Sequence, residues 1–311
     1  MPKKIVLLLA LFYLACEKGE DITLATSLLE SRLGVNASAD PLEGNALFFQ
    51  DVRYGNGERN TLDILLPDAA VLQGVVLFFH GGGFVSGDKA DAFSDLLKST
   101  MQQLLDNNIG IVSANYSFIN TSDNSGVLSS LEDGTAALDF IRSHLEVLQI
   151  PRDKIILAGV SAGAGIAQWN GFREASNQQV QGILALAAQS TYNLYEWEQV
   201  FPELNLDDVR NSNAELDELF IQFYKGEPSQ SDLEALDYRT FMDANDPPVY
   251  VFNQADDAVF NAQGELDFDV LYHSFRHGDY IRSKAIEVGL PFSGIYAESP
   301  DGFVLRVLNL Q

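Results

Sequence analysis

The stretch Gly159-Val160-Ser161-Ala162-Gly163 ends the apolar run Ile155–Val160 and opens an alanine-rich segment that can form a helix. A turn of the type glycine–x–serine–x–glycine, set between a strand and a helix, presents its serine hydroxyl above the sheet. The amino end of the following helix adds a partial positive charge beneath that serine. The pattern therefore predicts Ser161 as a nucleophile, and the alternative is a tight turn with an inert serine.

A second motif lies upstream, where His80-Gly81-Gly82-Gly83 follows the apolar run of residues 75–79. Glycine has no side chain, so a backbone N–H group can closely approach a reacting carbonyl. We expect the N–H groups of Gly82, Gly83 and Ala162 to stabilise the oxyanion that forms when Ser161 attacks. His80 lies on the oxyanion side, which favours a role in ordering the loop over a role as a base. Together the two motifs indicate acyl-transfer chemistry.

The composition excludes some partners. The chain has 311 residues, of which 46% are hydrophobic, and carries 44 acidic against 19 basic side chains for a formal charge of −25. The hydrophobic content is enough for a sizeable core. Nucleic acid needs a basic surface, so it is excluded as a partner, and strongly anionic substrates are disfavoured by repulsion.

The amino terminus reads as a targeting segment. Lys3 and Lys4 precede an apolar run over residues 5–15, which is too short for a membrane span of roughly 20 residues but fits a signal peptide. The only cysteine, Cys16, follows at once, so we expect a bacterial lipoprotein signal over residues 1–15 and a lipid on Cys16. The alternative is an ordinary signal peptide. We predict a polar tether over residues 16–45, a place in the cell envelope (periplasm or outer-membrane surface), and membrane contact only through the lipidated Cys16.

From residue 46 onward, apolar runs rich in β-forming residues alternate with helix-like segments. The expected strands are residues 46–54, Thr61–Leu66, 75–79, 110–115, 154–160, 180–187, Val249–Phe252 and 292–296, and the expected helices are residues 92–105, 128–148, 162–175 and 280–288. This alternation predicts an α/β fold with a mostly parallel sheet and helices on both faces. Residues 191–246 break the rhythm and are rich in aromatic and acidic residues. We interpret them as a helical cap over the site, the alternative being a helical excursion packed elsewhere.

As a set, these motifs resemble the alpha/beta-hydrolase superfamily, in the branch of hormone-sensitive-lipase-like and bacterial carboxylesterases that includes feruloyl-esterase-like proteins. The matching segments are Asp51-Val52-Arg53-Tyr54, residues 62–67, His80-Gly81-Gly82-Gly83-Phe84 with Gly87-Asp88-Lys89, residues 155–165 and residues 247–252. The resemblance implies a domain over residues 46–311 with an eight-stranded sheet, no cofactor, and a triad in the order serine, acid, histidine. It places the acid at Asp257, in the turn after Val249–Phe252, with Asp256 as a close competitor. Two adjacent aspartates can also be a solvated turn.

The histidine departs from the family pattern. Asp301-Gly302-Phe303 stands where the family has His-Gly-Phe, and a carboxylate is too weak a base at neutral pH. His273 and His277 lie between the acid turn and the next helix, so either can replace the missing base. The alternative is a pair of histidines in a loop. Two histidines four apart can also share a metal ion, but no clear third ligand follows, so no metal is predicted.

We therefore expect a lipid-anchored serine hydrolase of short acyl or aryl esters, either small molecules or esters linked to polysaccharide. Its catalytic residues are Ser161, Asp257 and either His273 or His277. Two alternatives remain, a catalytically impaired hydrolase that serves as an envelope binding protein, and a peptidase of the same fold.

Overall fold

The computed structural model describes residues 26–69, 71–121, 125–295 and 297–310, so the predicted signal peptide and Cys16 lie outside the described residues. Its centre is a nine-stranded sheet of order β1-β2-β3-β5-β4-β6-β7-β8-β9. The strands are β1 (Ala37–Ser38), β2 (Leu47–Arg53), β3 (Thr61–Leu66), β4 (Gly74–Phe79), β5 (Ile109–Ala114), β6 (Ile155–Val160), β7 (Val180–Leu186), β8 (Val249–Phe252) and β9 (Phe292–Ser293).

The sheet changes direction once along its width. Strands β1, β2, β3 and β5 pair antiparallel, and the pairs from β5 through β4, β6, β7 and β8 to β9 are parallel. This confirms the predicted α/β fold with a mostly parallel sheet. The expected eight strands are all present, and the two-residue β1 is the ninth. The last strand is shorter than expected, because pairing with β8 stops at Ser293.

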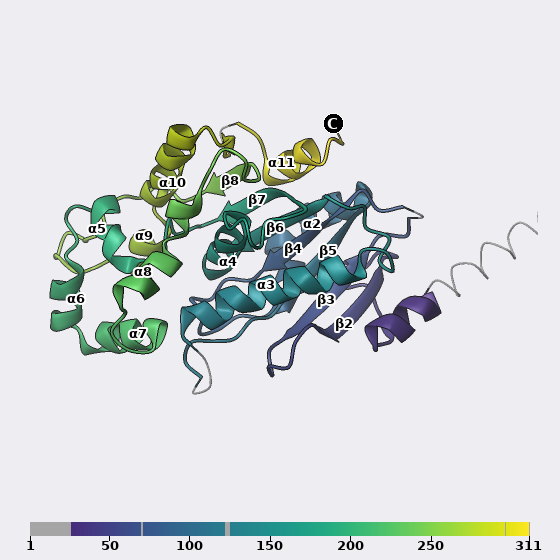
Figure 1. The fold of residues 1–311 in the computed structure, drawn as a ribbon, viewed down its shortest axis with the longest axis horizontal. Helices are drawn as coiled ribbons and strands as arrows, with labels where there is room; N and C mark the ends of the chain where they lie inside the picture. Colours follow the sequence, from purple (N-terminus) through teal and green to yellow (C-terminus); the bar gives the residue numbers. More distant parts are fainter. Residues whose placement is uncertain (1–25, 70, 122–124, 296, 311) are drawn as a thin grey trace, which may run out of the picture.

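Helices cover both faces of the sheet (Figure 1). In β4, Val75, Leu77 and Phe79 share one hydrophobic cluster with α3 (Val127–His144), α4 (Ala162–Gly171) and α10 (Phe275–Val288). The alternate residues Val76 and Phe78 belong to a second cluster with α2 (Asp95–Asp106) and α11 (Pro300–Val307). Because successive side chains of a strand point to opposite faces, one apolar strand serves both cores.

The segment before residue 46 differs from the expected tether. Residues 26–33 are helical, and Leu29 and Leu33 are buried in the same cluster as β4. Residues four apart lie on one face of a helix, so the two leucines dock together. Strand β1 then pairs with β2, and Leu42 is buried on the other face. Within the described residues the folded body therefore begins at residue 26 rather than 46.

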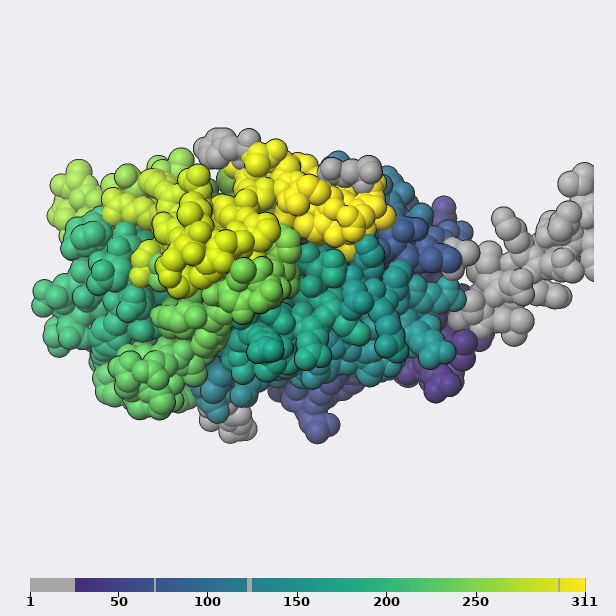
Figure 2. Space-filling model, turned by 45° about the horizontal axis from the view of Figure 1, so that its top comes forward, coloured from purple at the N-terminus to yellow at the C-terminus, as the bar shows by residue number. Residues whose placement is uncertain are grey.

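The insertion between β7 and β8 forms a helical block at one end of the sheet. Figure 1 shows α5 (Trp197–Val200), α6 (Leu206–Ser212), α7 (Ala214–Tyr224) and α8 (Gln230–Leu236) together there, and Figure 2 shows this green block beside the yellow residues of α10 and α11. Short 3-10 turns at Leu194–Glu196 and Tyr238–Phe241 lie at its two ends, and a third, Lys89–Phe93, precedes α2. A small cluster that includes Trp197, Phe201 and Leu271 joins the block to α9 (Phe268–His273).

Candidate active site

Ser161 lies at the turn between β6 and α4, with φ 52° and ψ −117°. This left-handed conformation costs energy for a residue with a Cβ atom and needs support from its surroundings. The Ser161 N–H donates to Leu186 O at 2.8 Å, which fixes the turn against β7. Gly163 allows the close approach that follows, because a Cβ at that position would lie 2.1 Å from Phe79 O. The sequence pattern therefore produces the expected elbow, with a half-buried serine.

The structure brings His273 to this serine. Ser161 Oγ and His273 Nε2 are 3.0 Å apart, which is hydrogen-bonding distance for a nucleophile and its general base. His273 is the last residue of α9, and its side chain is 23% exposed. The serine and one of the two expected histidines are thus together, although they are 112 residues apart in the chain.

The carboxylate beside His273 is that of Asp269. The prediction that Asp257 or Asp256 supplies the acid is therefore wrong. Asp269 Oδ1 accepts from His273 Nδ1 at 2.8 Å. Residues four apart in a helix share a face, so one turn of α9 supplies both groups. Asp257 instead lies 3.7 Å from Arg276, with its side chain 58% exposed, and Asp256 is also exposed.

Hydrogen bonds hold Asp269 ionised. Gln254 Nε2 donates to Asp269 Oδ2 at 3.0 Å, while His273 occupies the other oxygen. These bonds, first from His273 and then from Gln254, hold the pKa of the Asp269 carboxyl below its ordinary value. An ionised carboxylate at Nδ1 selects the imidazole tautomer whose Nε2 is free to accept the serine proton.

His277, the other expected base, has a different place. It is 1% exposed; its Nε2 donates to Leu271 O at 2.8 Å, and its Nδ1 lies 3.0 Å from Ser190 Oγ. Burial lowers its pKa to about 4, so it stays neutral. Both imidazoles are therefore bound to different protein partners and do not face a shared metal ion. Among the described residues no group of three or more histidine, cysteine, aspartate or glutamate side chains could hold one.

Position 301 lies outside this constellation. Asp301 is in the first turn of α11, where Ser299 caps the helix and Pro300 occupies one of the first positions. That helix packs on the sheet face opposite to α4. The segment that resembles the family's histidine motif is thus a helix start in this chain.

The glycine loop after β4 is firmly ordered. Gly82 has φ 109°, and a Cβ there would lie 2.2 Å from Ser86 O, so only glycine fits. His80 stacks on Tyr116, and its Nδ1 bonds to Gly81 O at 2.6 Å, so it orders the loop as predicted. Burial lowers the pKa of His80, which keeps it neutral beside Arg59.

The three predicted oxyanion donors come from two places. Gly83 lies with Ser161 and Ala162 in the lining of one pocket, and Gly82 precedes it in the loop. As the first residue of α4, Ala162 has no intrahelical acceptor for its N–H. This N–H is therefore available beside the serine hydroxyl.

Polar side chains from two strand ends fix α9 in place. Asn253 Nδ2 donates to His273 O at 3.1 Å and to Ala188 O at 2.7 Å. Gln189 Nε2 donates to Tyr272 O at 2.8 Å, and the Gln254 N–H donates to His273 O at 3.1 Å. The backbone that carries His273 is therefore tied to the carboxyl ends of β7 and β8.

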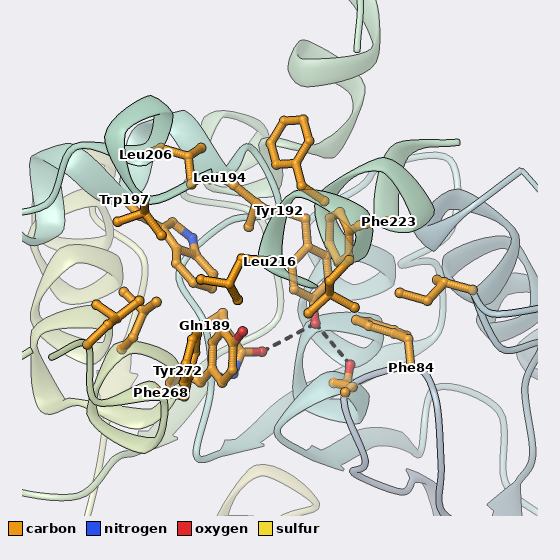
Figure 3. Close-up of a pocket in the computed structure, with 18 of the residues that line it drawn as sticks. Phe84, Gln189, Tyr192, Leu194, Trp197, Leu206, Leu216, Phe223, Phe268 and Tyr272 are labelled. Carbon is orange, nitrogen blue, oxygen red and sulfur yellow. Dashed lines mark hydrogen bonds between the residues drawn. The ribbon is translucent and has the colours of Figure 1, made fainter. Parts of the chain in front are cut away.

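A mostly apolar pocket of about 300 Å³ opens beside Ser161. In Figure 3, Phe84 and Phe223 lie on one side, Phe268 and Tyr272 lie on the other, and Leu194, Leu206 and Trp197 from the insertion stand above them. The structure thus places the insertion of residues 191–246 over the serine. No described helix has the length and apolarity needed to cross a bilayer.

The family model described as BD-FAE matches residues 62–269. The "Probable isoprenylcysteine alpha-carbonyl methylesterase" of Arabidopsis thaliana is 27% identical over 182 residues, which are 58% of this chain and only 37% of that protein.

Two solved structures share the fold. The truncated form of a carbohydrate esterase from gut microbiota has a TM-score of 0.63 at 14% identity, and covers 84% of this chain and 96% of that one. A bifunctional GH43-CE protein of Bacteroides eggerthii has a TM-score of 0.62 at 16% identity, and the match covers 84% of this chain and 37% of that one. At these identities the likeness shows the fold alone.

Proposed function

The chain belongs to the BD-FAE family of alpha/beta hydrolases, and on that premise we propose that it is a serine hydrolase of carboxylic esters. The observation that carries the proposal is the chain of contacts from Ser161 through His273 to Asp269, at 3.0 Å and 2.8 Å. Nucleophile, base and orienting acid in hydrogen-bond contact are what acyl transfer requires.

In the proposed reaction, Ser161 Oγ attacks the ester carbonyl carbon while its proton passes to His273 Nε2. The Asp269 carboxylate stabilises the imidazolium, and the N–H groups of Ala162 and Gly83 receive the oxyanion. The imidazolium then protonates the leaving alkoxide. Water repeats the sequence on the acyl-enzyme and releases the acid.

The alternative of a catalytically impaired binding protein depended on the aspartate at position 301. The geometry supports the enzyme instead, because α9 supplies an imidazole to Ser161 without that position. A fluorophosphonate probe separates the two, since rapid covalent labelling of a serine needs a working base. We expect wild type to be labelled and Ser161→Ala to remain unlabelled.

Hydrolysis of p-nitrophenyl acetate tests the roles of the residues. We expect Ser161→Ala and His273→Gln each to lower kcat by about 10³-fold or more, as the loss of a nucleophile or its base does. The matched control is His144→Gln, because His144 lies at the end of α3 and bonds to Phe140 O. A His273→Gln variant with wild-type kcat would refute the mechanism.

We also propose that the natural ester is linked to a carbohydrate and that the protein is held in the cell envelope by a lipid on Cys16. The first proposal is supported by the carbohydrate esterases among proteins of the same fold. The second is supported by the basic start, apolar run and cysteine of the amino terminus. Metabolic labelling with a fatty-acid analogue tests the anchor: wild type should carry the label, and Cys16→Ser should lose it and leave the membrane fraction.

A further inference from the structure

The pocket beside Ser161 indicates which ester fits. We propose that it binds the aliphatic acyl chain of a medium-chain ester, about six to ten carbons long. This inference rests on the proposed ester hydrolysis and names its substrate class.

The pocket is continuous with the reacting atoms, because Ser161 and Ala162 form part of its lining. Its far wall comes from the insertion. The apolar side chains there include Leu194, Trp197, Leu206, Leu216, Phe220 and Phe223. Burying an alkyl chain against such a wall is favourable by the hydrophobic effect, whereas an acetyl group would leave most of the space unused.

The one charged side chain in the lining, Arg210, is already paired. Its guanidinium bonds to Asp217 at 2.8 Å and to Glu227, and it stacks 3.7 Å over the ring of Phe220. Arg210 therefore presents the pocket with an apolar stem and a neutralised head. It does not offer a recognition group for a carboxylate or a sugar hydroxyl.

Two further polar side chains in the lining are bonded within the protein. Gln189 Nε2 donates to Tyr272 O, and Tyr192 Oη donates to Ala162 O at 3.1 Å. Figure 3 also marks the contact between Tyr192 Oη and Gln189 Oε1. The Tyr272 hydroxyl, also in the lining, can bond one group of a ligand, but a sugar with several hydroxyls would lose water from most of them without equal replacement, at a cost of roughly 1–3 kcal/mol per polar group. An aliphatic chain has no such cost.

The geometry assigns the pocket to the acyl half of the ester. The leaving oxygen must face His273 Nε2 to receive its proton, and His273 is not among the residues that line the pocket. Gly83 and Ala162, the expected oxyanion donors, are among them. The acyl chain therefore enters the pocket, and the alcohol leaves on the side of His273.

The volume sets the length. An apolar protein cavity of about 150 Å³ holds a six-carbon ring, so roughly twelve carbons is the limit for twice that space. The pocket here measures about 300 Å³ and is open to solvent, so part of that volume does not enclose a ligand. We therefore expect the preferred acyl chain to be shorter than twelve carbons.

A series of p-nitrophenyl esters from acetate to laurate tests chain length. A buried methylene is worth about fourfold in affinity, so even partial burial predicts at least a 30-fold rise in kcat/KM from acetate to octanoate. Leu216→Trp fills the pocket and should move the optimum to butyrate or shorter. The matched control is Leu96→Trp in α2, where the side chain is 89% exposed, and its profile should be that of wild type.

A second series assigns the two halves of the ester. Alkyl acetates of increasing alcohol length should show less than a threefold gain in kcat/KM, and methyl ferulate should be cleaved more slowly than methyl octanoate. A preference for long alcohols, or for ferulate over octanoate, would overturn the assignment.

Binding without turnover separates this inference from the proposed function. Ser161→Ala, titrated calorimetrically below the micelle concentration, should bind decanoate at least tenfold more tightly than butyrate. If no ester is hydrolysed while decanoate is still preferred, the proposed function fails and the pocket assignment stands. If wild type hydrolyses acetate best and Ser161→Ala binds both acids equally, the pocket assignment is overturned and the hydrolase stands.

Discussion

The sharpest test of the site compares two aspartates. Asp269 Oδ1 lies 2.8 Å from His273 Nδ1, whereas Asp257 contacts Arg276 at 3.7 Å. If Asp269 stabilises the imidazolium that forms during attack by Ser161, Asp269→Asn must slow the chemical step. Asp257→Asn must leave that step almost unchanged.

The structure sets the size of the effect. Two unit charges about 4 Å apart attract by about 1 kcal/mol in water and about 4 kcal/mol near a protein surface. Asp269 is 70% exposed and His273 is 23% exposed, so solvent screens the pair and a value of about 2 kcal/mol is expected. That corresponds to about a 30-fold loss of kcat. Asparagine keeps an acceptor for Nδ1–H, so KM should stay within twofold.

The assay is steady-state hydrolysis of p-nitrophenyl butyrate by wild type, Asp269→Asn and Asp257→Asn. Thermal unfolding of each variant checks that the fold is retained. Asp257→Asn is expected to keep kcat within twofold of wild type. A larger loss for Asp257→Asn than for Asp269→Asn would refute the assignment and restore the acid predicted from the sequence.

Three further predictions concern stability, each read from urea unfolding. Burial holds the pKa of His277 near 4, so between about pH 6.5 and 4 the unfolded chain binds a proton that the folded chain does not. The free energy of unfolding should therefore fall by about 3 kcal/mol over this range. His277→Gln should flatten this pH dependence, whereas His144→Gln should leave it unchanged. Gly278→Ala in α10 should stabilise by about 0.5–1 kcal/mol because its Cβ meets only ordinary contacts, whereas Gly134→Ala should destabilise because its Cβ would lie 2.3 Å from an isoleucine methyl. Lys89→Met should lower the free energy of unfolding by about 3 kcal/mol, because it leaves the buried Asp63 without its counter-charge.

The parts of the site that the sequence predicts are local. The turn at Ser161 and the glycine loop before Phe84 follow from residues adjacent in the chain, and each forms where its pattern places it. Strands β3 and β8 have the bounds expected from their apolar runs. Local patterns succeed here because backbone conformation and strand burial are decided within a few residues.

The choice between His273 and His277 depends on a break that the sequence shows only faintly. Ser274 leaves the helical conformation, with φ −57° and ψ 145°, and caps α10. The break separates α9 from α10, so the two histidines do not continue one helix. A serine that precedes a helical pattern is a known start signal, and Ser274 is such a serine.

The sequence does not identify Asp269 as the acid, because the family pattern places the acid in the turn after β8. The spacing of Asp269 and His273 is that of one helical face, but α9 has only six residues, which is too short for a helical pattern to stand out in the sequence. The prediction that position 301 belongs to the site fails for a related reason. Ser299-Pro300 is a helix-start signature, yet the Gly302-Phe303 that follows also fits the family's His-Gly-Phe pattern.

Because one turn of α9 supplies both the acid and the base, the rest of the fold has to position only this one helix. A triad built from separate loops needs each loop positioned independently, whereas here only α9 has to be placed against Ser161. Asn253 and Gln189 tie it to the strand ends, and Leu271 of the same helix packs with Trp197 of the insertion. Position 301 can then serve as a helix start, because α9 already supplies both the base and the acid.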